Sequence, residues 1–262
     1  MPNQTEWTRS LPDGADVFVH TGPGTLAGRY LRQFWQPICL AREIATDRAR
    51  PARLMGEDFA VFRGADGRPH VIDARCAHRG ALLSLGHVEG DSIRCRYHGW
   101  RYDCSGQCVE QPYENPERAR KIAIGSYPAE EYVGIIFVYL GAQSPPPLLP
   151  RFDVHEEPGR VLRVSCRLLE HNYFQELENL CDPAHVPFAH QPFFDRSADK
   201  LKPVRVGRTA WGLVVSLASP WPGVAYMGMP NLFQIGGAVS NPGALSTAWI
   251  VPVDDEIGRA HV

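Results

Sequence analysis

The sequence predicts an α+β protein built from two β-rich domains, and three observations support this fold class. From about residue 38 to 142, short apolar segments alternate with Gly, Asp and Ser turns, which is typical of antiparallel strands. A proline-rich stretch at 145–150 indicates a stiff, extended connector between domains. Beyond it, one segment with helical periodicity at 171–181 is followed by further strand-like segments up to residue 253.

We therefore divide the chain into four parts. Residues 1–37 form an N-terminal segment that packs on the domains, 38–144 the first β domain, 145–150 the connector and 151–262 the second domain. A length of 262 residues suits two domains of moderate size.

Composition and charge exclude several classes of protein. The chain is 44% hydrophobic and 21% charged, as in an ordinary globular protein. The formal net charge of -2 argues against a dedicated nucleic-acid surface, and no apolar run is long enough to cross a membrane. The polar N-terminus, broken by Pro2 and Pro12, does not resemble a signal peptide. With seven cysteines, an odd number, these features favour the reducing cytoplasm.

The N-terminal segment is expected to contain one short helix. Leu26, Tyr30, Leu31 and Phe34 recur at helical spacing after the Gly-Pro-Gly at 22–24. A phosphate-binding loop is disfavoured, because the Lys-Ser/Thr that should follow is missing and no strand precedes it.

The first domain is expected to be a small antiparallel β structure. Its longest apolar run, Val133 to Leu140, predicts a fully buried strand. The expected strands lie at residues 52–55, 59–63, 70–74, 92–95, 100–103, 109–110, 121–127 and 133–140.

Two short ligand pairs lie at loops of this domain: Cys76-x-His78 and Cys95-x-x-His98. A structural zinc site usually combines CxxC and HxxxH pairs, whereas here each pair offers one thiolate and one imidazole. That mixture suits a [2Fe–2S] centre of the Rieske kind, in which two thiolates hold one iron and two neutral imidazoles the other. A structural zinc protein remains the alternative from a non-redox class.

The two motifs resemble those of a known family, the Rieske non-heme iron, aromatic-ring-hydroxylating oxygenases. They read C-x-H-R-G at 76–80 and C-x-Y-H-G-W at 95–100, and the segment GPGTLAGRYLRQFWQP at 22–37 is similar to the opening of the phthalate-dioxygenase-like branch. Rieske proteins of respiratory complexes carry an extra cysteine in each loop. Here Ala81 and Tyr97 occupy those positions, so the disulfide of those proteins cannot form.

Trp100 stands where the respiratory proteins place a hydroxyl that hydrogen-bonds to the cluster. We therefore expect Trp100 next to the cluster ligands and a reduction potential on the low side of the Rieske range, because hydrogen bonds to the sulfurs stabilise the reduced state.

A second group of chemically active residues follows the predicted helix at 171–181. Two imidazoles, His185 and His190, with the carboxylate of Asp182 nearby indicate a non-heme Fe(II) site with open positions. Asp182 and His185 are expected to share a helix face, and Pro187 to bend the chain so that His190 turns toward the same metal.

The same resemblance covers this segment, which reads E-N-x-x-D-x-x-H-x4-H from Glu178. It implies that His185 and His190 bind mononuclear iron. It also implies that Asp182 hydrogen-bonds His185 and connects it to a cluster histidine, His98, of a neighbouring subunit in a head-to-tail homotrimer. Asn179 would lie next to the iron ligands or line the pocket; a surface position on the helix is the alternative.

The family's third iron ligand is an Asp far downstream, and this chain offers no convincing equivalent. Asp254, Asp255 and Glu256 fall in an expected turn after the strand at 246–253. Two explanations compete. The chain is a fragment of a longer enzyme, with its helix-grip catalytic domain incomplete at the C-terminus, or it is a short form in which water or another residue completes the iron. We favour the fragment, which would be inactive alone.

The second domain is expected to alternate strands with turns. Residues 223–229 and 236–237 are interpreted as loop or bulge positions, and no sheet closure is expected near the C-terminus. The expected strands lie at residues 161–169, 204–206, 212–217, 232–235 and 246–251.

The resemblance predicts a terminal oxygenase that inserts oxygen from dioxygen into a small organic, by default aromatic, substrate. Hydroxylation, dihydroxylation and O-demethylation would use the same machinery. The sequence contains no flavin or nicotinamide motif, so a separate NAD(P)H-dependent reductase or a ferredoxin must supply electrons. The alternative is a protein that only transfers electrons, with an inactive or incomplete mononuclear iron site.

Overall fold

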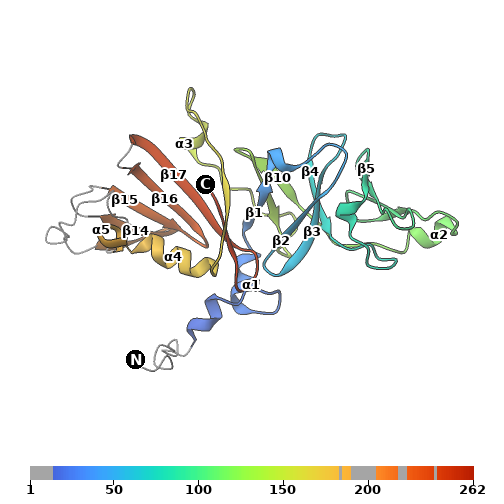
Figure 1. The fold of residues 1–262 in the computed structure, drawn as a ribbon, viewed down its shortest axis with the longest axis horizontal. Coiled ribbons are helices and arrows are strands. Elements are labelled where there is room, and N and C mark those ends of the chain that lie inside the picture. Colours follow the sequence, from blue (N-terminus) through green and yellow to red (C-terminus); the bar gives the residue numbers. More distant parts are fainter. Residues whose placement is uncertain (1–13, 183–184, 190–204, 218–222, 239–240) are drawn as a thin grey trace.

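The structure is a computed structural model of the chain, and it describes residues 14–182, 185–189, 205–217, 223–238 and 241–262. The molecule is elongated (Figure 1). A small sheet that contains β5 (His87–Glu89) lies toward one end of the long axis, and α4 (Tyr173–Cys181) lies toward the other. In the described part of the chain, no helix combines the length and the apolar character that a membrane span requires.

The N-terminal half contains three sheets in which every strand pair is antiparallel. The five residues of β11 are all buried, as the apolar run at 133–140 predicts. The strand orders are β1 (Trp35–Leu40), β11 (Ile135–Tyr139), β10 (Ala129–Tyr132); then β2 (Arg50–Leu54), β3 (Glu57–Arg63), β4 (Pro69–Asp73), β9 (Ser126–Tyr127); and β5, β6 (Ser92–Arg94), β7 (Arg101–Asp103), β8 (Cys108–Glu110).

The C-terminal half is one seven-stranded antiparallel sheet with α4 packed on one face. Tyr173 and Leu177 of α4 join Ala248, Ile250 and Ala260 of the sheet in the largest buried core. The strand order is β12 (Cys166–Leu169), β18 (Gly258–His261), β17 (Asn241–Pro252), β16 (Leu232–Ala238), β15 (Gly223–Gly228), β14 (Gly212–Leu217) and β13 (Arg205–Thr209).

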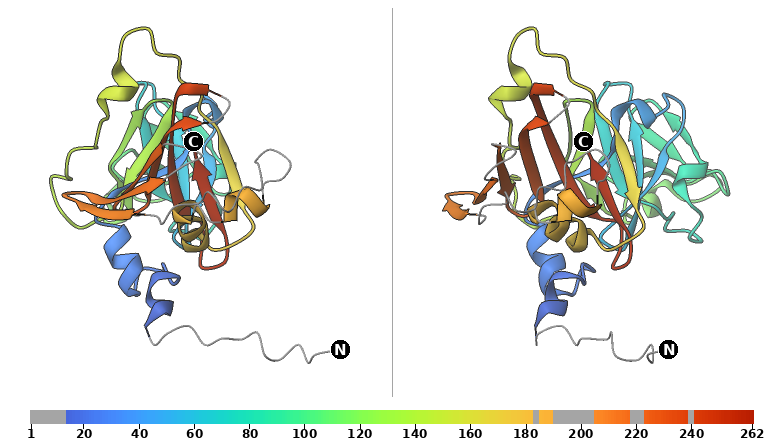
Figure 2. Two further views of the ribbon diagram at one scale, coloured as in Figure 1. Left: turned by 90° about the vertical axis from the view of Figure 1, so that its left-hand side faces the viewer. Right: turned by 60° about the vertical axis from the view of Figure 1, so that its left-hand side comes forward.

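Short helices connect the sheets. Helix α1 begins where Thr25 caps it, because the Thr25 hydroxyl accepts a hydrogen bond from the Gly28 N–H at 3.0 Å. In Figure 2, α1 lies at one edge of the molecule, below the seven-stranded sheet. The short helices are η2 (Ala15–Phe18), α1 (Leu26–Leu31), η3 (Ala41–Glu43), η4 (Leu83–Leu85), α2 (Pro116–Ala119), α3 (Asp153–Glu156) and α5 (Val186–Ala189).

The two halves are joined through the turn between β2 and β3. Met55 and Gly56 adopt positive φ values of 50° and 78°, which suit a tight hairpin. Their N–H groups donate to the carbonyls of Pro252 and Val253 at the end of β17, each at 2.9 Å. The hairpin tip therefore fixes the first half against the last long strand of the second.

Two expectations for the second half are wrong. Residues 223–229 were expected to be loop or bulge positions, but 223–228 form β15, which pairs without a register shift, and β18 closes the sheet between β12 and β17 near the C-terminus. Glycine begins and ends β15 and begins β18, and glycine weakens a strand considered alone. Neighbouring strands pair with β15 and β18 along both edges, so non-local pairing outweighs the weak local preference.

Candidate functional site

The two ligand loops repeat one backbone arrangement. In the first, the Cys76 N–H donates to the Ala81 carbonyl at 2.9 Å, and the Gly80 N–H donates to the Cys76 carbonyl at 2.9 Å. In the second, Cys95 N–H donates to the Trp100 carbonyl at 2.8 Å, and the N–H of the glycine after His98 to the Cys95 carbonyl at 3.0 Å. These bonds close each loop on its own cysteine.

Glycine follows each ligand pair because the backbone turns into the left-handed region there. Gly80 has φ 69° and Gly99 has φ 74°, values that side chains with a Cβ rarely adopt. The turn directs both loops toward the same place.

The loops bring two thiols and two imidazoles together, as the sequence predicts. Cys76 and Cys95 are each only 3% exposed, and all seven cysteines are free. Burial raises the pKa of the Cys95 thiol, and the adjacent Cys76 raises it further. The ring centroids of His78 and His98 lie 4.6 Å apart, with His98 exposed to solvent.

The surroundings of His78 fit a metal ligand. Trp100 stacks on its ring, with centroids 4.6 Å apart and planes 7° from parallel, as expected for a residue next to the cluster ligands. The Nδ1 atom of His78 is buried and has no hydrogen-bond partner among the described residues. Leaving such a buried polar atom unpaired costs about 1–3 kcal/mol, which coordination to iron would offset. The residues present therefore fit a two-thiolate, two-imidazole cluster.

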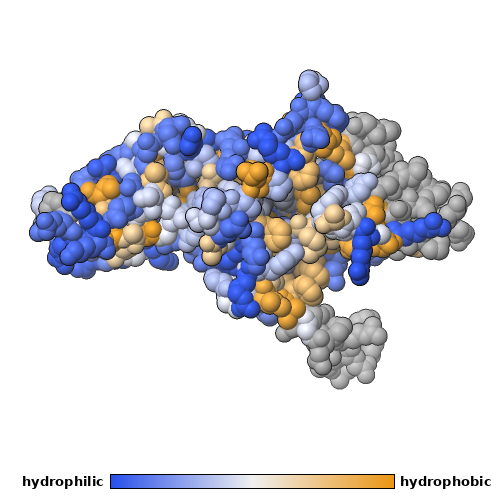
Figure 3. Space-filling model, turned by 180° about the vertical axis from the view of Figure 1, so that it is seen from behind, coloured by the Kyte–Doolittle hydropathy of each residue, from blue (hydrophilic) through white to orange (hydrophobic). Residues whose placement is uncertain are grey.

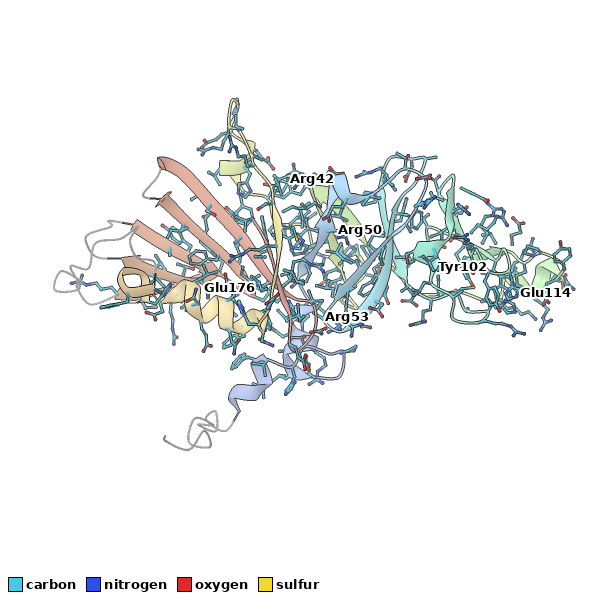
Figure 4. All side chains as sticks on the ribbon, viewed as in Figure 1. Arg42, Arg50, Arg53, Tyr102, Glu114 and Glu176 are labelled. Carbon is cyan, nitrogen blue, oxygen red and sulfur yellow. The ribbon has the colours of Figure 1, made fainter. Side chains whose placement is uncertain are left out.

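Tyr102 contacts the first ligand loop, and the sequence analysis did not identify this residue. Its hydroxyl lies 3.2 Å from Cys76 Sγ and accepts the Ala77 N–H at 3.1 Å (Figure 4 labels Tyr102). Burial and the neighbouring Cys76 raise the pKa of Tyr102, so the hydroxyl keeps its proton and can donate to the sulfur. The available signal was strand alternation, which turns Tyr102 inward between Arg101 and Asp103.

The second motif begins on α4, where Asn172 caps the helix with its side-chain oxygen 2.8 Å from the Phe174 nitrogen. Asn179 is exposed near the end of this helix. The helix ends at Cys181, and Asp182 is extended, with φ -101° and ψ 98°.

The expected shared helix face of Asp182 and His185 is therefore wrong. Pro183 follows Asp182, and the residue before a proline is disfavoured in the helical region. Pro187 does not cause the break, because it lies in the first turn of α5, where proline is tolerated.

His185 still lies against Asp182. Its Nδ1 is 2.5 Å from the backbone carbonyl oxygen of Asp182, whose side chain is exposed. A carbonyl only accepts, so this contact favours the tautomer with the proton on Nδ1, in which Nε2 is the unprotonated nitrogen that is able to bind a metal. His190 lies outside the described residues.

Two acids near the C-terminus, Asp254 and Asp255, accept hydrogen bonds from nearby groups. Asp255 accepts the Thr21 N–H at 2.8 Å and contacts His20 Nδ1 at 2.8 Å. Asp254 accepts the N–H groups of Glu256 and Ile257 at 3.1 and 3.0 Å. The Asp255 carboxylate joins the N-terminal segment to the turn before β18, and the Asp254 carboxylate stabilises that turn itself.

An apolar cavity of about 540 Å³ lies beside α4. Glu178, Cys181 and Met227 line it near the end of the helix, and Tyr30 of α1 and Phe18 of η2 line the other side. Figure 3 shows apolar residues gathered over the middle of the rear face of the molecule.

Comparison with known proteins identifies the first half of the chain. Residues 34–128 match the Rieske [2Fe-2S] domain. The chain is 33% identical over 268 residues to the tert-butanol monooxygenase / tert-amyl alcohol desaturase oxygenase subunit of Aquincola tertiaricarbonis, covering 91% of this chain and 57% of that protein. It is 39% identical over 186 residues to the phenoxybenzoate dioxygenase subunit alpha of Ectopseudomonas oleovorans, covering 65% and 45%.

The phthalate 4,5-dioxygenase oxygenase subunit of Pseudomonas putida is 33% identical over 206 residues, covering 71% of this chain and 47% of that protein. The chain thus spans about half the length of these relatives.

Solved structures share the fold across both halves. NdmB of Pseudomonas putida CBB5 superposes with a TM-score of 0.74 at 27% identity, covering 88% of this chain and 73% of that one. The oxygenase in a complex of carbazole 1,9a-dioxygenase with its ferredoxin superposes with a TM-score of 0.67 at 21% identity, covering 88% and 70%. The Rieske domain match and the oxygenase relatives, together with the loop geometry, show that the chain belongs to the Rieske terminal oxygenases and contains a [2Fe–2S] domain of their kind.

Proposed function

We propose that the chain is part of a terminal oxygenase that inserts oxygen from dioxygen into an aromatic or other small organic substrate. The observation that carries this proposal is the pairing, in one chain, of two closed thiol–imidazole loops with a second, separate histidine motif at the end of α4. The oxygenase relatives support the reaction class, and the apolar cavity beside α4 supports an apolar, ring-sized substrate.

In this proposal each ligand residue has a distinct role. Cys76 and Cys95 hold one iron of the cluster, and His78 and His98 hold the other. His185 and His190 bind mononuclear Fe(II). When bound, the cluster transfers single electrons and the Fe(II) centre activates dioxygen.

The chain's own groups position these ligands. The Asp182 carbonyl holds the His185 ring in the tautomer that leaves Nε2 for the metal. Tyr102 donates to Cys76 Sγ, and Trp100 covers the face of His78 and keeps water from it. Asn179, exposed at the end of α4, would line the approach to the iron.

A head-to-tail homotrimer fits the shape of the molecule. The ligand loops adjoin β6 and β7 in the part of the chain around Tyr102, whereas α4, which carries Glu176, lies at the opposite end (Figure 4). Within one chain, the Tyr102 and Glu176 regions lie on different sides of the molecule along its long axis (Figure 4). A ring of three chains would place the cluster end of one chain against the α4 end of the next, where the exposed Asp182 side chain could connect the sites.

Electrons would enter at the cluster end from an NAD(P)H-dependent reductase or a ferredoxin. His98 is exposed there, Tyr97 is 63% exposed, and Arg79 and Arg96 beside them are exposed cations. Such a surface suits a partner with an acidic face. The carbazole dioxygenase structure, which includes a ferredoxin, supports this type of partner.

We also propose that the chain divides at the connector 145–150 and works in the cytoplasm. The position of the Rieske match, at 34–128, supports the boundary. None of the seven cysteines forms a disulfide, which supports a reducing compartment, since an oxidising one would favour disulfides.

Metal analysis of anaerobically reconstituted protein tests the proposed function. We expect about three Fe and two sulfides per chain, with one Fe lost selectively when His185 and His190 are both changed to Ala. Two Fe per chain in the unaltered protein would indicate electron transfer alone. Zinc in a colourless preparation would contradict a cluster altogether.

A further inference from the structure

In both ligand loops, the residue directly before the ligand cysteine is an arginine that reaches across its own loop. Arg75 Nη1 donates to the Gly80 carbonyl at 3.0 Å, and Arg94 Nη1 donates to the Gly99 carbonyl at 2.9 Å. Each bond spans from the residue before cysteine to the glycine four residues after cysteine. The sequence analysis did not identify either arginine.

These bonds act on the same glycines that close the loops. The N–H of each glycine already donates to its cysteine carbonyl, so the arginine holds the other side of the glycine, at its carbonyl. A guanidinium–carbonyl bond is charge-assisted and stronger than a bond between neutral groups. Both ends of the turn are thereby fixed, and with them the directions of the cysteine and histidine side chains.

The two arginines differ in what holds them. Arg94 makes two hydrogen bonds to Glu89 on β5, at 2.7 and 2.9 Å, and two to Glu110 on β8, at 3.0 and 2.9 Å. Arg101 on β7 also donates to Glu110, at 3.0 Å. The outer strands of the small sheet thus hold Arg94 on both sides.

Arg75 is exposed and pairs with no carboxylate of the described residues within salt-bridge distance. Its side chain must lose conformational freedom for a single hydrogen bond. In water such a bond contributes little net stability.

We propose that Arg94 and Arg75 are positioning residues that hold the two cluster-binding loops closed, and that Arg94 contributes most because Glu89 and Glu110 fix its guanidinium. Arg94 is suited to this role because Nε, Nη1 and Nη2 all donate in one plane. A lysine ammonium cannot reproduce two bidentate pairs and a carbonyl bond together. The second loop should therefore be the more rigid one.

The test compares Arg94→Gln with Arg75→Gln in the cluster-loaded full chain. The measurements are the rate of cluster loss to an iron chelator under anaerobic conditions, the EPR spectrum of the reduced cluster, and the reduction potential. We expect about tenfold faster loss for Arg94→Gln, as for losing a charge-assisted hydrogen bond, with altered EPR g values and a lower potential. The lower potential follows because the charges of Glu89 and Glu110 lose a cation. Arg75→Gln should change the loss rate by less than about threefold.

Arg118→Gln is the matched control, since Arg118 forms an exposed ion pair with Glu114 in the same half of the chain. It should leave the loss rate, the spectrum and the potential unchanged. If Arg94→Gln fails to take up a cluster, Glu110→Gln replaces it, since this change keeps Arg94 and weakens its support; an intermediate loss rate is then expected. Loss rates and spectra of Arg94→Gln equal to those of Arg118→Gln would overturn the proposal. A larger effect of Arg75→Gln than of Arg94→Gln would overturn the ranking of the two loops.

Discussion

The cluster-binding region and the α4 region differ in how the backbone positions their proposed metal ligands. The proposed cluster ligands lie on two loops that begin and end on paired backbone within one small part of the chain, so each cysteine bonds to its own loop. His185 instead follows a helix end and a proline, and its expected companion His190 is five residues further on. The first arrangement is local, whereas the second depends on how a helix is held.

The helix is held mainly at its beginning. The Asn172 side chain donates to the carbonyls of Val19 and Asp255 at 3.1 and 2.6 Å, and the Tyr173 hydroxyl donates to the Phe18 carbonyl at 2.9 Å. The other end, with Asn179 and Asp182, is exposed. From this difference we expect cluster binding to be independent of α4, whereas binding of the mononuclear iron should depend on how α4 is held.

The largest expected effect is loss of the cluster while the mononuclear iron is retained. Cys95→Ala removes one of two thiolates from the cluster, so we expect complete loss of the cluster absorbance and of its EPR signal. The iron at His185 should remain, because no backbone bond connects its segment to this loop among the described residues. Iron and sulfide analysis checks this: about one Fe and no sulfide per chain. Loss of all iron would show that the two regions are coupled.

The reciprocal change acts on the α4 region. His185→Ala should remove about one Fe of three and leave the EPR spectrum of the reduced cluster unchanged. His87→Ala is the matched control, since His87 is exposed on β5 and contacts no proposed ligand. A shifted cluster spectrum in His185→Ala alone would contradict the independence of the two regions.

A smaller effect compares the two loops within the cluster region. Gly80→Ala and Gly99→Ala both place a Cβ at positive φ, at a cost of about 1–2 kcal/mol. A Cβ on Gly99 would also lie 3.0 Å from Pro112 Cγ, whereas one on Gly80 meets nothing within 4 Å. We expect the melting temperature of the cluster-loaded protein to fall further in Gly99→Ala, by the equivalent of about 1 kcal/mol. A larger fall in the melting temperature for Gly80→Ala than for Gly99→Ala would contradict the assumption that the backbone strain at the two glycines is equal.

The smallest expected effect at neutral pH concerns the stability of the seven-stranded sheet, through the buried His261. His261 on β18 is 0% exposed, neither ring nitrogen has a partner among the described residues, and burial lowers its pKa from 6.5 to about 3. The unfolded chain therefore takes up a proton below pH 6.5 while the folded chain does not until near pH 3. The free energy of unfolding should therefore decrease as the pH is lowered below 6.5, and the contribution of His261 to this decrease should be about 2 kcal/mol at pH 5.

Urea unfolding between pH 7 and 5 measures this slope. His261→Phe should flatten it, and His87→Gln, at an exposed position, should not. An unchanged slope in His261→Phe would assign the acid sensitivity to other groups.

The meeting of the two thiol–imidazole pairs could be predicted from the sequence because each pair has a short spacing. A cysteine and a histidine two or three residues apart in each loop need only local turns to meet, and the loops confirm the expected contact between His78 and His98. Tyr102 was missed because its contact with Cys76 joins residues far apart in sequence. Arg75 and Arg94 were missed because a polar side chain before a cysteine carries no distinctive pattern.

The second half was harder to predict for the same physical reason. Strands β15 and β18 are stabilised by neighbours across the sheet, and their own short sequences, which contain glycine, give little sign of it. The predicted end of the helix at residue 181 matches α4. The shared helix face expected for Asp182 and His185 was wrong because Pro187 was taken as the break, whereas Pro183 already acts on Asp182.

Electron–nuclear double resonance of the reduced cluster tests the central claim most directly. If Cys76, Cys95, His78 and His98 hold the cluster, two ¹⁴N nuclei of imidazole should couple strongly to the unpaired spin, and His78→Ser should remove one coupling or the whole signal. A reduced cluster with no strongly coupled nitrogen would mean that only sulfur binds the iron, and it would contradict the assignment of both histidines.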